Sequence, residues 1–473
     1  MKLFLEIFSF NLLIFPVASY AYLDPGTGSM LLSVFVGFSS AAYFGLRRLP
    51  SLLRAGAYKL TGKKGRIDKA SIVFYSESKN YWPTFKPIIS ELIKNNVDVV
   101  YLTSDEDEEI FKNPSFRNVK ARFIGKGNQA FFKLNFLECD ILVLTTPGVD
   151  VLQIKRSRGV KNYVHIVHSL SDIHGYKLYS FDYYDTILVS GSSQEESLRH
   201  LEKTRGTIRK EIVRLGCPYL DNLVSRANKV KFTDKNILLL APTWGKNSFL
   251  YKYSPELLKI LSSRGYKLIF RPHPQSLISD KEILRDWLKI LNEIEGSEYD
   301  NRPDGFDSLS RSSIMLSDLS GVVFDFSFVF KRPVVTIGGN FVKEGFEAWD
   351  LPKDAWELSS YDLIGKRIDS TSSNSSEEIC EVLETIQSSF KQNEAEINTL
   401  ISQEAINLGN ASKGIAAFLV NKSSKLQKQA KKNQPITSSR IYRIFGNLKH
   451  KKFIGGISLV LEAVEKRKME IGS

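Results

Sequence analysis

Four polar segments of the sequence directly follow short apolar runs. They are APTW (241–244), RPHP (271–274), SDLSG (317–321) and the end of YVHIVH at His168. Each apolar run is rich in Val, Ile, Leu or Tyr and has the length of a buried strand. Ligands of open α/β sheets bind at the carboxyl ends of the strands, so we expect the chemistry of this protein in these four loops.

The RPHP segment holds a histidine between two prolines. Pro272 and Pro274 each fix a φ angle and bias Arg271 and His273 toward an extended backbone, so the imidazole loses little entropy on meeting a ligand. A histidine of near-neutral pKa can donate to a phosphate oxygen or move a proton, and Arg271 can add a charge-assisted hydrogen bond. The segment predicts a phosphate-binding loop, although a purely structural turn would have the same sequence.

The SDLSG segment precedes an apolar run that reads as a helix. Ser320 is expected to cap this helix, and Gly321 lets a ligand come close to the backbone. The free N–H groups at the helix start would then form a phosphate cradle. An ordinary helix cap explains the same residues, so the segment alone leaves both interpretations open.

Asp325 lies inside the same predicted helix among Phe324, Phe326 and Phe328. Aspartate is a poor helix former and is costly to bury without a partner. It either faces a ligand or bonds a neighbouring loop.

The remaining histidines are weaker candidates. His165 and His168 lie three residues apart in a predicted strand, so their side chains should point to opposite faces, with His165 half-buried in the core. His174 lies in a loop, and His200 and His450 have polar or basic neighbours and are expected in solvent.

The cysteines and the main acidic run do not predict a metal site. Cys139, Cys217 and Cys380 lie far apart without a CxxC or Cys/His pattern, and they are expected as small core residues in a reducing compartment. The run SDEDEE (104–109) contains a D-x-D pattern, but it adjoins further acidic residues and fits a surface helix. We predict no protein-bound metal and no cofactor.

Short apolar strands alternate with helical periodicity along the body of the chain, which predicts parallel β/α units. One series fills residues 70–225 and a second fills residues 235–420, including an amphipathic helix over 280–294. The fold class is therefore α/β, with two successive Rossmann-like domains.

The first 50 residues contain two apolar runs, 3–20 and 29–46, separated by AYLDPGTG. They read as a cleaved signal peptide followed by one anchor, or as an uncleaved helical hairpin, since each run approaches the ~20 residues that span a bilayer. A pair of buried helices packed on the domain is the third possibility. The Lys and Arg residues of the basic linker, residues 51–69, place the body on the cytoplasmic side.

The net charge of +13 is concentrated near the two ends of the chain. Residues 421–473, a predicted helical tail, carry +10 and residues 47–69 carry +7, so the body between them is slightly acidic. A nucleic-acid-binding core would carry its basic residues on a folded face. The distribution therefore predicts no nucleic-acid partner and favours an anionic membrane surface.

In this order, APTW, RPHP and SDLSGVVFDF resemble the CDP-glycerol glycerophosphotransferase family, the teichoic-acid primases and polymerases. The family pattern of the last segment resembles SDYSSVMFDF, and this chain has Leu319 for Tyr and Gly321 for the second Ser. The resemblance covers about residues 160–345. It implies a two-domain glycosyltransferase-B fold and a metal-independent transfer of a phospho-polyol from a CDP-linked donor to a lipid-linked acceptor.

The resemblance also implies roles for individual residues. His273 would contact the donor pyrophosphate, and His168 would be the base for the acceptor hydroxyl, although Ser169 stands where the family usually has Gly. The other residues assigned to donor phosphate or nucleotide binding are Arg271, Ser317, Asp318, Ser320, Gly321, Thr243, Trp244 and Asp325.

The predicted function is a membrane-associated transferase that moves glycerol phosphate, or a related phospho-polyol, to a hydroxyl of a cell-envelope polymer and releases CMP. We expect it at the inner (cytoplasmic) membrane with the catalytic body facing the cytoplasm. One alternative is an enzyme of the same fold that uses a nucleotide sugar for lipopolysaccharide or capsule synthesis. The other is an inactive membrane-tethered scaffold.

Overall fold

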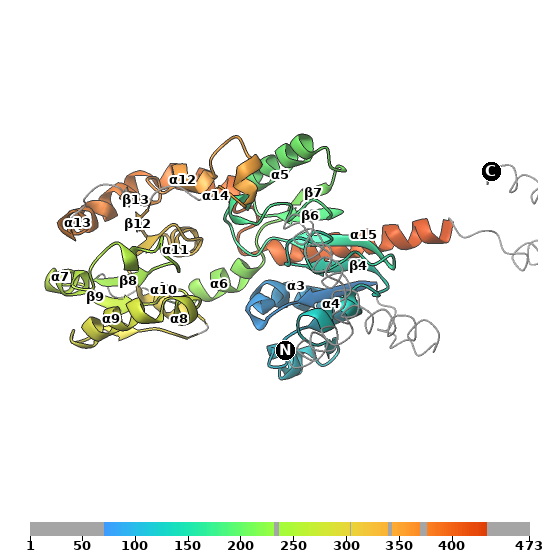
Figure 1. Ribbon diagram of the computed structural model, residues 1–473, viewed down its shortest axis with the longest axis horizontal. Coiled ribbons are helices and arrows are strands. Elements are labelled where there is room, and N and C mark those ends of the chain that lie inside the picture. Colours follow the sequence, from blue (N-terminus) through green and yellow to red (C-terminus); the bar gives the residue numbers. More distant parts are fainter. Residues whose placement is uncertain (1–70, 231–235, 303, 339–342, 369–375, 433–473) are drawn as a thin grey trace, which may run out of the picture. The chain divides into compact units, whose positions relative to one another are not determined.

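A computed structural model describes residues 71–230, 236–302, 304–338, 343–368 and 376–432 (Figure 1). The chain divides into two compact units, Met1–Asp68 and Lys69–Ser473. The predicted membrane segments, the basic linker and the tail beyond residue 432 lie outside the described residues. None of the described helices is both long and apolar enough to cross a bilayer.

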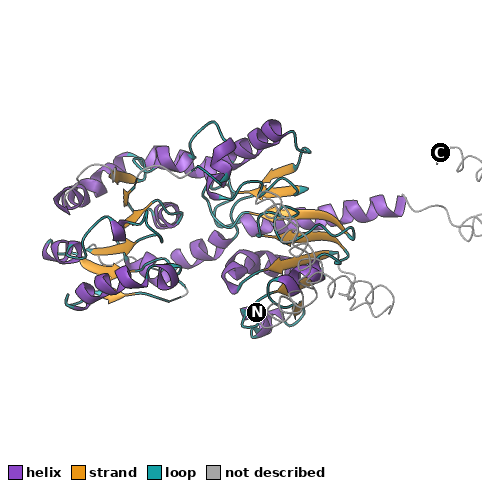
Figure 2. Cartoon of the chain, in the orientation of Figure 1, coloured by secondary structure: helices purple, strands orange, loops and turns teal. Residues whose placement is uncertain are grey.

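The unit Lys69–Ser473 contains two parallel sheets with helices packed against them (Figure 2). The first sheet has the strand order β3-β2-β1-β4-β5-β6-β7. Its strands are β1 (Ile72–Ser76), β2 (Val99–Thr103), β3 (Lys120–Phe123), β4 (Cys139–Leu144), β5 (Val160–Ile166), β6 (Thr186–Val189) and β7 (Glu211–Arg214). The central strands β1 and β2 are buried at every position, which is typical of a parallel sheet covered on both faces.

The second sheet has the strand order β10-β9-β8-β11-β12-β13. Its strands are β8 (Ile237–Ala241), β9 (Lys267–Phe270), β10 (Glu298–Tyr299), β11 (Ile314–Asp318), β12 (Val334–Ile337) and β13 (Gly365–Ile368). All pairings within both sheets are parallel in the described residues. The prediction of two successive parallel α/β domains is confirmed.

Helices connect the strands. The α-helices are α3 (Trp82–Lys94), α4 (Asn128–Leu134), α5 (Ser192–Arg205), α6 (Tyr219–Ala227), α7 (Leu257–Ser263), α8 (Ser276–Ser279), α9 (Lys281–Asn292), α10 (Phe306–Arg311), α11 (Val322–Phe330), α12 (Trp356–Ser360), α13 (Ser376–Gln392), α14 (Glu394–Glu404) and α15 (Ala411–Lys432). Short 3-10 helices are η1 (Lys79–Tyr81), η2 (Glu109–Phe111), η3 (Pro114–Phe116), η4 (Ile173–Gly175), η5 (Phe249–Tyr251) and η6 (Glu347–Asp350).

Successive residues of β8 enter different cores, because side chains of a strand alternate between its two faces. Leu238 and Leu240 pack in a cluster with residues of α7, α9 and α13. Leu239 packs in a second cluster with residues of α6, α11 and α14. The second sheet therefore has an apolar core on each face. The amphipathic helix predicted over 280–294 is α9, which buries Leu284, Trp287 and Leu291.

Helix α15 departs from the predicted domain boundary at residue 420. Its residues Ala411, Ile415 and Leu419 are buried in the core of the first sheet, with residues of β1 and α3. The chain thus returns to the first domain after completing the second. The apolar spacing of α15 predicts a helix with one buried face, but it does not say which sheet that face covers.

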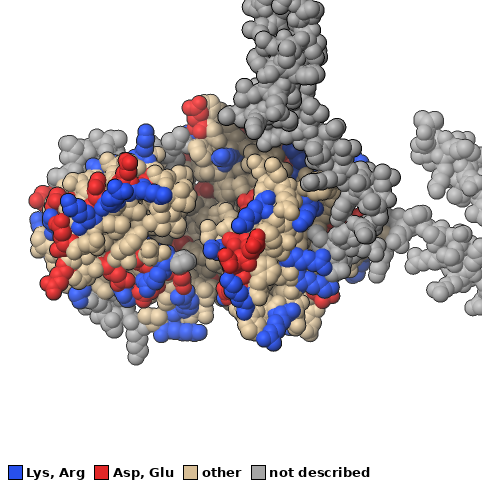
Figure 3. Space-filling model, turned by 60° about the horizontal axis from the view of Figure 1, so that its bottom comes forward, with Lys and Arg blue, Asp and Glu red and all other residues tan. Residues whose placement is uncertain are grey.

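Charged side chains of both signs mix on the surface of the described residues. The face in Figure 3 carries Lys and Arg next to Asp and Glu, and neither sign covers that face alone. This mixed face agrees with a slightly acidic body, because the excess of Lys and Arg in the chain lies in residues 47–69 and 421–473.

Candidate active site

Each sheet has one topological switch point, where the strand order reverses. It lies between β1 and β4 in the first sheet and between β8 and β11 in the second. Open α/β sheets bind ligands at the carboxyl ends of the strands at such points. We call these places the β1/β4 switch point, formed by residues 76–78 and 145–147, and the β8/β11 switch point, formed by residues 242–245 and 319–321.

The loop after β8 is held in place by Asp318 at the end of β11. The two carboxylate oxygens of Asp318 accept the backbone N–H groups of Thr243 at 2.7 Å and Phe249 at 2.9 Å. Burial raises the pKa of Asp318 to about 6, and the two N–H donors oppose that rise. Ser317 is fully buried and donates its hydroxyl to the carbonyl of Ala241 at 2.6 Å. Both side chains point into the protein and hold the loop.

Ser320 does not cap the helix that follows it. Helix α11 begins at Val322, the N-cap position is occupied by Gly321, and no side chain accepts the free N–H groups there. The predicted Ser320 cap is therefore wrong, because the helix starts one residue later than the sequence suggested. The N–H groups of Val323 and Phe324 donate to the carbonyls of Ser320 and Gly321, whereas no hydrogen bond of the Gly321 and Val322 N–H groups is found among the described residues. These two N–H groups suit an anion.

His273 lies beside this switch point on the loop that follows β9. Its backbone N–H donates to the carbonyl of Pro242 at 3.0 Å, and its ring Nδ1 accepts the N–H of Gln275 at 3.1 Å. The neutral ring must then carry its proton on Nε2, where it can donate to a ligand. The surrounding protein desolvates the ring and lowers its pKa, against the opposing charge of Asp280. The half-exposed Trp244 ring lies 6.5 Å away, centroid to centroid.

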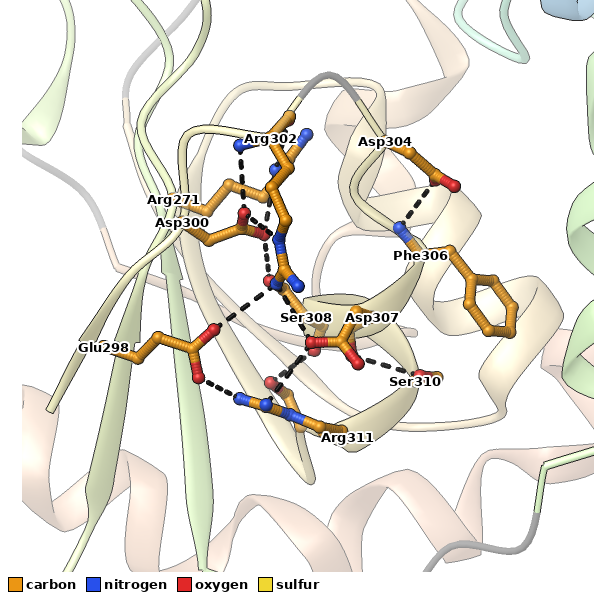
Figure 4. Close-up of polar contacts among 11 residues, drawn as sticks. Arg271, Glu298, Asp300, Arg302, Asp304, Phe306, Asp307, Ser308, Ser310 and Arg311 are labelled. Carbon is orange, nitrogen blue, oxygen red and sulfur yellow. Dashed lines mark hydrogen bonds and ion pairs between the residues drawn. The ribbon is translucent and has the colours of Figure 1, made fainter. Parts of the chain in front are cut away.

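Arg271 is largely engaged elsewhere, as Figure 4 shows. Its Nη1 forms an ion pair with the buried Asp300 at 2.9 Å and donates to the carbonyl of Arg302 at 2.9 Å. Asp300 also accepts from Arg302 Nε at 2.7 Å and from the hydroxyl of Ser308. Hydrogen bonds and nearby charge hold the pKa of Asp300 well below its usual range despite burial. Arg271 thus joins the loop after β9 to the segment after β10.

Asp325 is buried in α11, and no hydrogen bond of its carboxyl group is found among the described residues. Burial alone raises its pKa to about 8, so the group is mainly protonated at neutral pH. Asp325 lies near the buried thiol of Cys217, whose pKa it raises. A hydrogen bond from Asp325 to a neighbouring loop, one of the two predicted situations, is not found among the described residues.

His168 lies in the loop beyond β5, which ends at Ile166. Its Nδ1 is 3.3 Å from the hydroxyl of Tyr176, and its ring packs edge-on against Tyr81 at 5.4 Å. Burial lowers the pKa of His168 and keeps the ring neutral near pH 7. If Nδ1–H donates to Tyr176, the Nε2 lone pair remains free to accept a proton.

His165 lies in the core, as predicted, but it is fully buried and not half-buried. Both of its ring nitrogens lack a hydrogen-bond partner, and burial lowers its pKa to about 3. Its ring meets Tyr176 at 6.2 Å, and the His168 ring meets the same tyrosine at 6.0 Å. The two histidine rings therefore share one aromatic neighbour, and the alternation of a strand does not apply to His168 because β5 ends at Ile166.

The loop after His168 touches the start of α11. A Cβ atom added to Gly321 would lie 2.9 Å from the Ser171 hydroxyl oxygen. One residue later, the N–H of Asp172 donates to Glu357 of α12 at 2.8 Å. Within the unit Lys69–Ser473, the loop after β5 therefore contacts the β8/β11 switch point.

Several polar residues near His168 escaped the sequence analysis. Glu77 follows β1, Thr145 and Thr146 follow β4, and Tyr176 supports His168. The available signal was the same one that identified RPHP, namely polar residues directly after an apolar strand, here in VFYSES and VLTTP.

The acidic run SDEDEE serves the protein's own structure. Buried Glu108 accepts the hydroxyl of Tyr101, and Glu109 accepts from Trp82 Nε1 at 2.8 Å and Lys86 at 2.7 Å. Across the described ranges, no group of three His, Cys, Asp or Glu residues has the arrangement of a metal site. All three cysteines are buried and free.

Among the solved structures that the chain resembles are two of the same enzyme with a TM-score above 0.5. The wall teichoic acid polymerase TagF is 19% identical, over 82% of this chain and 97% of that chain, with a TM-score of 0.53. A histidine-to-alanine variant of TagF is 20% identical, over 80% and 97%, with the same TM-score. A UDP-GlcNAc 2-epimerase from Neisseria meningitidis reaches 0.49, at 15% identity over 75% and 100%. The TagF likeness establishes a glycosyltransferase-B fold.

No curated protein sequence matches the chain. Residues 58–338, more than half of the chain, match the family described as CDP-glycerol:poly(glycerophosphate) glycerophosphotransferase. The matched region contains both switch points and both candidate histidines, and it confirms the family that the three sequence segments indicated. The chain therefore belongs to the CDP-glycerol:poly(glycerophosphate) glycerophosphotransferase family and is a transferase.

Proposed function

We propose that this transferase moves a glycerol phosphate unit from CDP-glycerol to a hydroxyl of a lipid-linked cell-envelope polymer and releases CMP. The observation that carries the proposal is the β8/β11 switch point in a chain of this family. There, His273 Nε2–H and the backbone N–H groups of Gly321 and Val322 are available to an anion. Neutral imidazole N–H and backbone N–H groups suit a pyrophosphate whose negative charge grows during transfer.

In the proposed reaction, the acceptor oxygen attacks the β-phosphorus of the donor. A new P–O bond forms to the acceptor, the P–O bond to CMP breaks, and CMP leaves with the bridging oxygen. His273 and the start of α11 stabilise the charge that develops on the leaving group. Asp318 and Ser317 act indirectly, because their side chains hold the 242–249 loop against β11.

The proton of the acceptor hydroxyl goes to Nε2 of His168. The lowered pKa of His168 keeps its ring neutral at pH 7, as a base must be, and Tyr176 orients the ring through Nδ1. A correctly placed general base contributes roughly 10²–10⁴-fold. In this proposal the first domain binds the acceptor and the second binds the donor.

The proposed acceptor is lipid-linked, and the proposed location is the inner membrane with the catalytic body facing the cytoplasm. Support comes from the two apolar runs before residue 47 and from the basic residues of 47–69 and 421–473. Basic segments next to an anionic leaflet add about 1 kcal/mol of attraction per charge.

The test uses the full chain in bilayer nanodiscs and measures CMP release from CDP-glycerol, with CDP-ribitol, UDP-sugars and GDP-sugars as parallel donors. We expect release with a CDP-polyol, and loss of release in His273→Ala and His168→Ala. His200→Ala, on helix α5, is the matched histidine control.

Turnover of a UDP- or GDP-sugar without CDP-polyol turnover would replace this proposal with the nucleotide-sugar alternative. Binding and turnover of no donor would indicate a scaffold. Unchanged CMP release in both histidine variants would refute the assigned site.

A further inference from the structure

We propose that Glu77, Thr145 and Thr146, at the β1/β4 switch point, form a subsite for uncharged hydroxyl groups of the acceptor, next to His168. This inference rests on the proposed function and assigns the acceptor side of the same reaction. The ligand is defined by its chemistry as a terminal polyol or sugar that presents neighbouring hydroxyls.

Strand register brings these residues to one edge of the sheet. Tyr75 of β1 pairs with Leu144 of β4, and Leu144 pairs with His165 of β5. Glu77 and Thr146 each lie two residues beyond this row, and His168 lies three residues beyond it. All three therefore emerge at the carboxyl ends of adjacent strands, where the order reverses.

The two threonine hydroxyls are buried, and Glu77 is the only side chain found to interact with either of them in the described residues. Thr145 is 1% exposed and Thr146 is 7% exposed, and the Oγ1 atom of each lacks a hydrogen-bond partner. Thr146 nevertheless lies close enough to Glu77 to favour its charged form. A buried hydroxyl without a hydrogen-bond partner destabilises the protein, and a ligand hydroxyl that bonds to it would remove that cost.

Glu77 gives the subsite its selectivity. It is partly buried, and burial raises its pKa, opposed by Thr146. Its negative charge contributes to the raised pKa of Tyr75, Tyr81 and Tyr184. Among the described groups, no lysine or arginine lowers the pKa of Glu77. A carboxylate without a nearby cation repels phosphate and accepts hydrogen bonds from neutral hydroxyls. The subsite therefore fits the hydroxyl terminus of an acceptor and not its phosphodiester.

Aromatic contacts join this subsite to the proposed base. The hydroxyl of Tyr184 donates to the carbonyl of Thr146. The charge of Glu77 helps to raise the pKa of Tyr81, and the Tyr81 ring packs against the His168 ring with 5.4 Å between the ring centroids. A hydroxyl bound by Glu77 and the threonines would thus lie on the same edge as the group that takes its proton.

The experiment compares Thr145→Val, Thr146→Val and Glu77→Gln with the wild type, all as full chains. With CDP-glycerol as donor, we expect the acceptor KM to rise about tenfold or more, since each variant removes one or more hydrogen bonds to the ligand. The donor KM should stay within about twofold of its wild-type value. Thr145→Ser and Thr146→Ser keep the hydroxyl and should restore the acceptor KM.

Thr186→Val is the matched control, because Thr186 is equally buried but begins β6 at the opposite end of the sheet and bonds Asn162 at 3.0 Å. It should leave the acceptor KM unchanged. An unchanged acceptor KM in Thr145→Val, Thr146→Val and Glu77→Gln, or equal changes in the Thr186→Val control, would overturn the subsite.

Direct binding separates this inference from the proposed function. Saturation-transfer NMR is recorded with a short poly(glycerol phosphate) and, separately, with a lipid-free N-acetylhexosamine glycoside. Binding of either one that is lost in the Thr145→Val/Thr146→Val double variant but kept in His273→Ala supports the subsite, even if no CDP donor is consumed. Binding of neither compound, or equal binding in the double variant, rejects it.

Discussion

The two switch points of this protein use their side chains in opposite ways. At the β8/β11 switch point, the side chains of Ser317 and Asp318 form hydrogen bonds within the protein and hold the loop after β8, and the N–H groups of Gly321 and Val322 point to no partner among the described residues. At the β1/β4 switch point, Thr145 and Thr146 are buried without partners. A fixed set of N–H donors suits an anion, whereas unpaired hydroxyls and a carboxylate suit neutral hydroxyls.

The two candidate histidines also differ in the hydrogen-bond partner of their Nδ1 atoms. Nδ1 of His273 accepts a backbone N–H, so its Nε2 must donate. Nδ1 of His168 faces a tyrosine hydroxyl that can accept, so its Nε2 can take a proton. One ring is arranged to stabilise charge and the other to act as a base. Position after a strand is therefore insufficient to assign a histidine's role, and the partner of Nδ1 decides it.

The largest expected effect separates the two rings. His168→Ala should reduce turnover by roughly 10²–10⁴-fold with unchanged donor affinity, and added imidazole should rescue part of it. His273→Ala should reduce turnover by about 10²–10³-fold and also weaken donor binding. CMP release and donor titration provide both measurements. Imidazole rescue of His273→Ala together with an unrescued His168→Ala would reverse the assignment.

Arg271→Ala should act mainly on stability. Removing the guanidinium leaves the buried carboxylate of Asp300 with fewer partners, so the free energy of unfolding should fall by about 3 kcal/mol. Denaturant unfolding measures this change, with Arg271→Lys as the charge-preserving control. A normal stability combined with a large rise in donor KM would instead make Arg271 a donor ligand.

Gly321→Ala tests the backbone character of the β8/β11 switch point. A methyl group there meets the Ser171 hydroxyl at 2.9 Å and would crowd a phosphate at the start of α11. Donor KM should rise about tenfold, equivalent to the loss of one hydrogen bond to a charged group. The Ser171→Ala/Gly321→Ala double variant removes the contact with Ser171. If it restores donor KM, the crowding was internal and the cradle is not formed by this backbone.

Tyr176→Phe should lower turnover about three- to tenfold, since it removes one neutral hydrogen bond that orients His168. The thermal stability of this variant should change little, and its donor KM should stay constant.

The pH profile of turnover tests the role of His168 directly. In the wild type, turnover should rise with pH and level off below pH 6.5, because burial lowers the pKa of His168. A profile that levels off above 6.5 would argue against His168 as the base.

Asp325→Asn should produce the smallest effect, visible only in the pH dependence of stability. Burial raises the pKa of Asp325 in the folded protein from its ordinary value of 3.8 to about 8, so the folded protein binds more protons than the unfolded chain between about pH 4 and pH 8. Wild-type stability should therefore fall as pH rises across that range, and the variant should lose this contribution. Thermal unfolding at pH 5 and pH 8.5 tests it. Parallel curves for the two proteins would mean that Asp325 is already ionised or exposed.

The sequence predicted the strand-end loops well because strand and loop composition are local properties. Buried apolar strands followed by polar loops identified residues 241–244, 271–274 and 317–321, and parallel topology then required them to meet at one edge. The same reasoning applied to VFYSES and VLTTP would have identified Glu77 and the two threonines. Short common residues gave that region a weaker signal than a histidine between prolines.

The sequence by itself determined the two α/β domains, their strand-end loops and the restricted backbone around His273. These features depend on hydrophobic periodicity and proline geometry, which act over a few residues. Only the tertiary structure decided which polar groups are free. Asp318 accepts hydrogen bonds from Thr243 and Phe249, Arg271 pairs with Asp300, and the hydroxyl of Thr145 has no partner. Tertiary packing also decided that α15 covers the first sheet. Hydrogen-bond partners 29 to 75 residues away make these choices, and such distances leave no local pattern in the sequence.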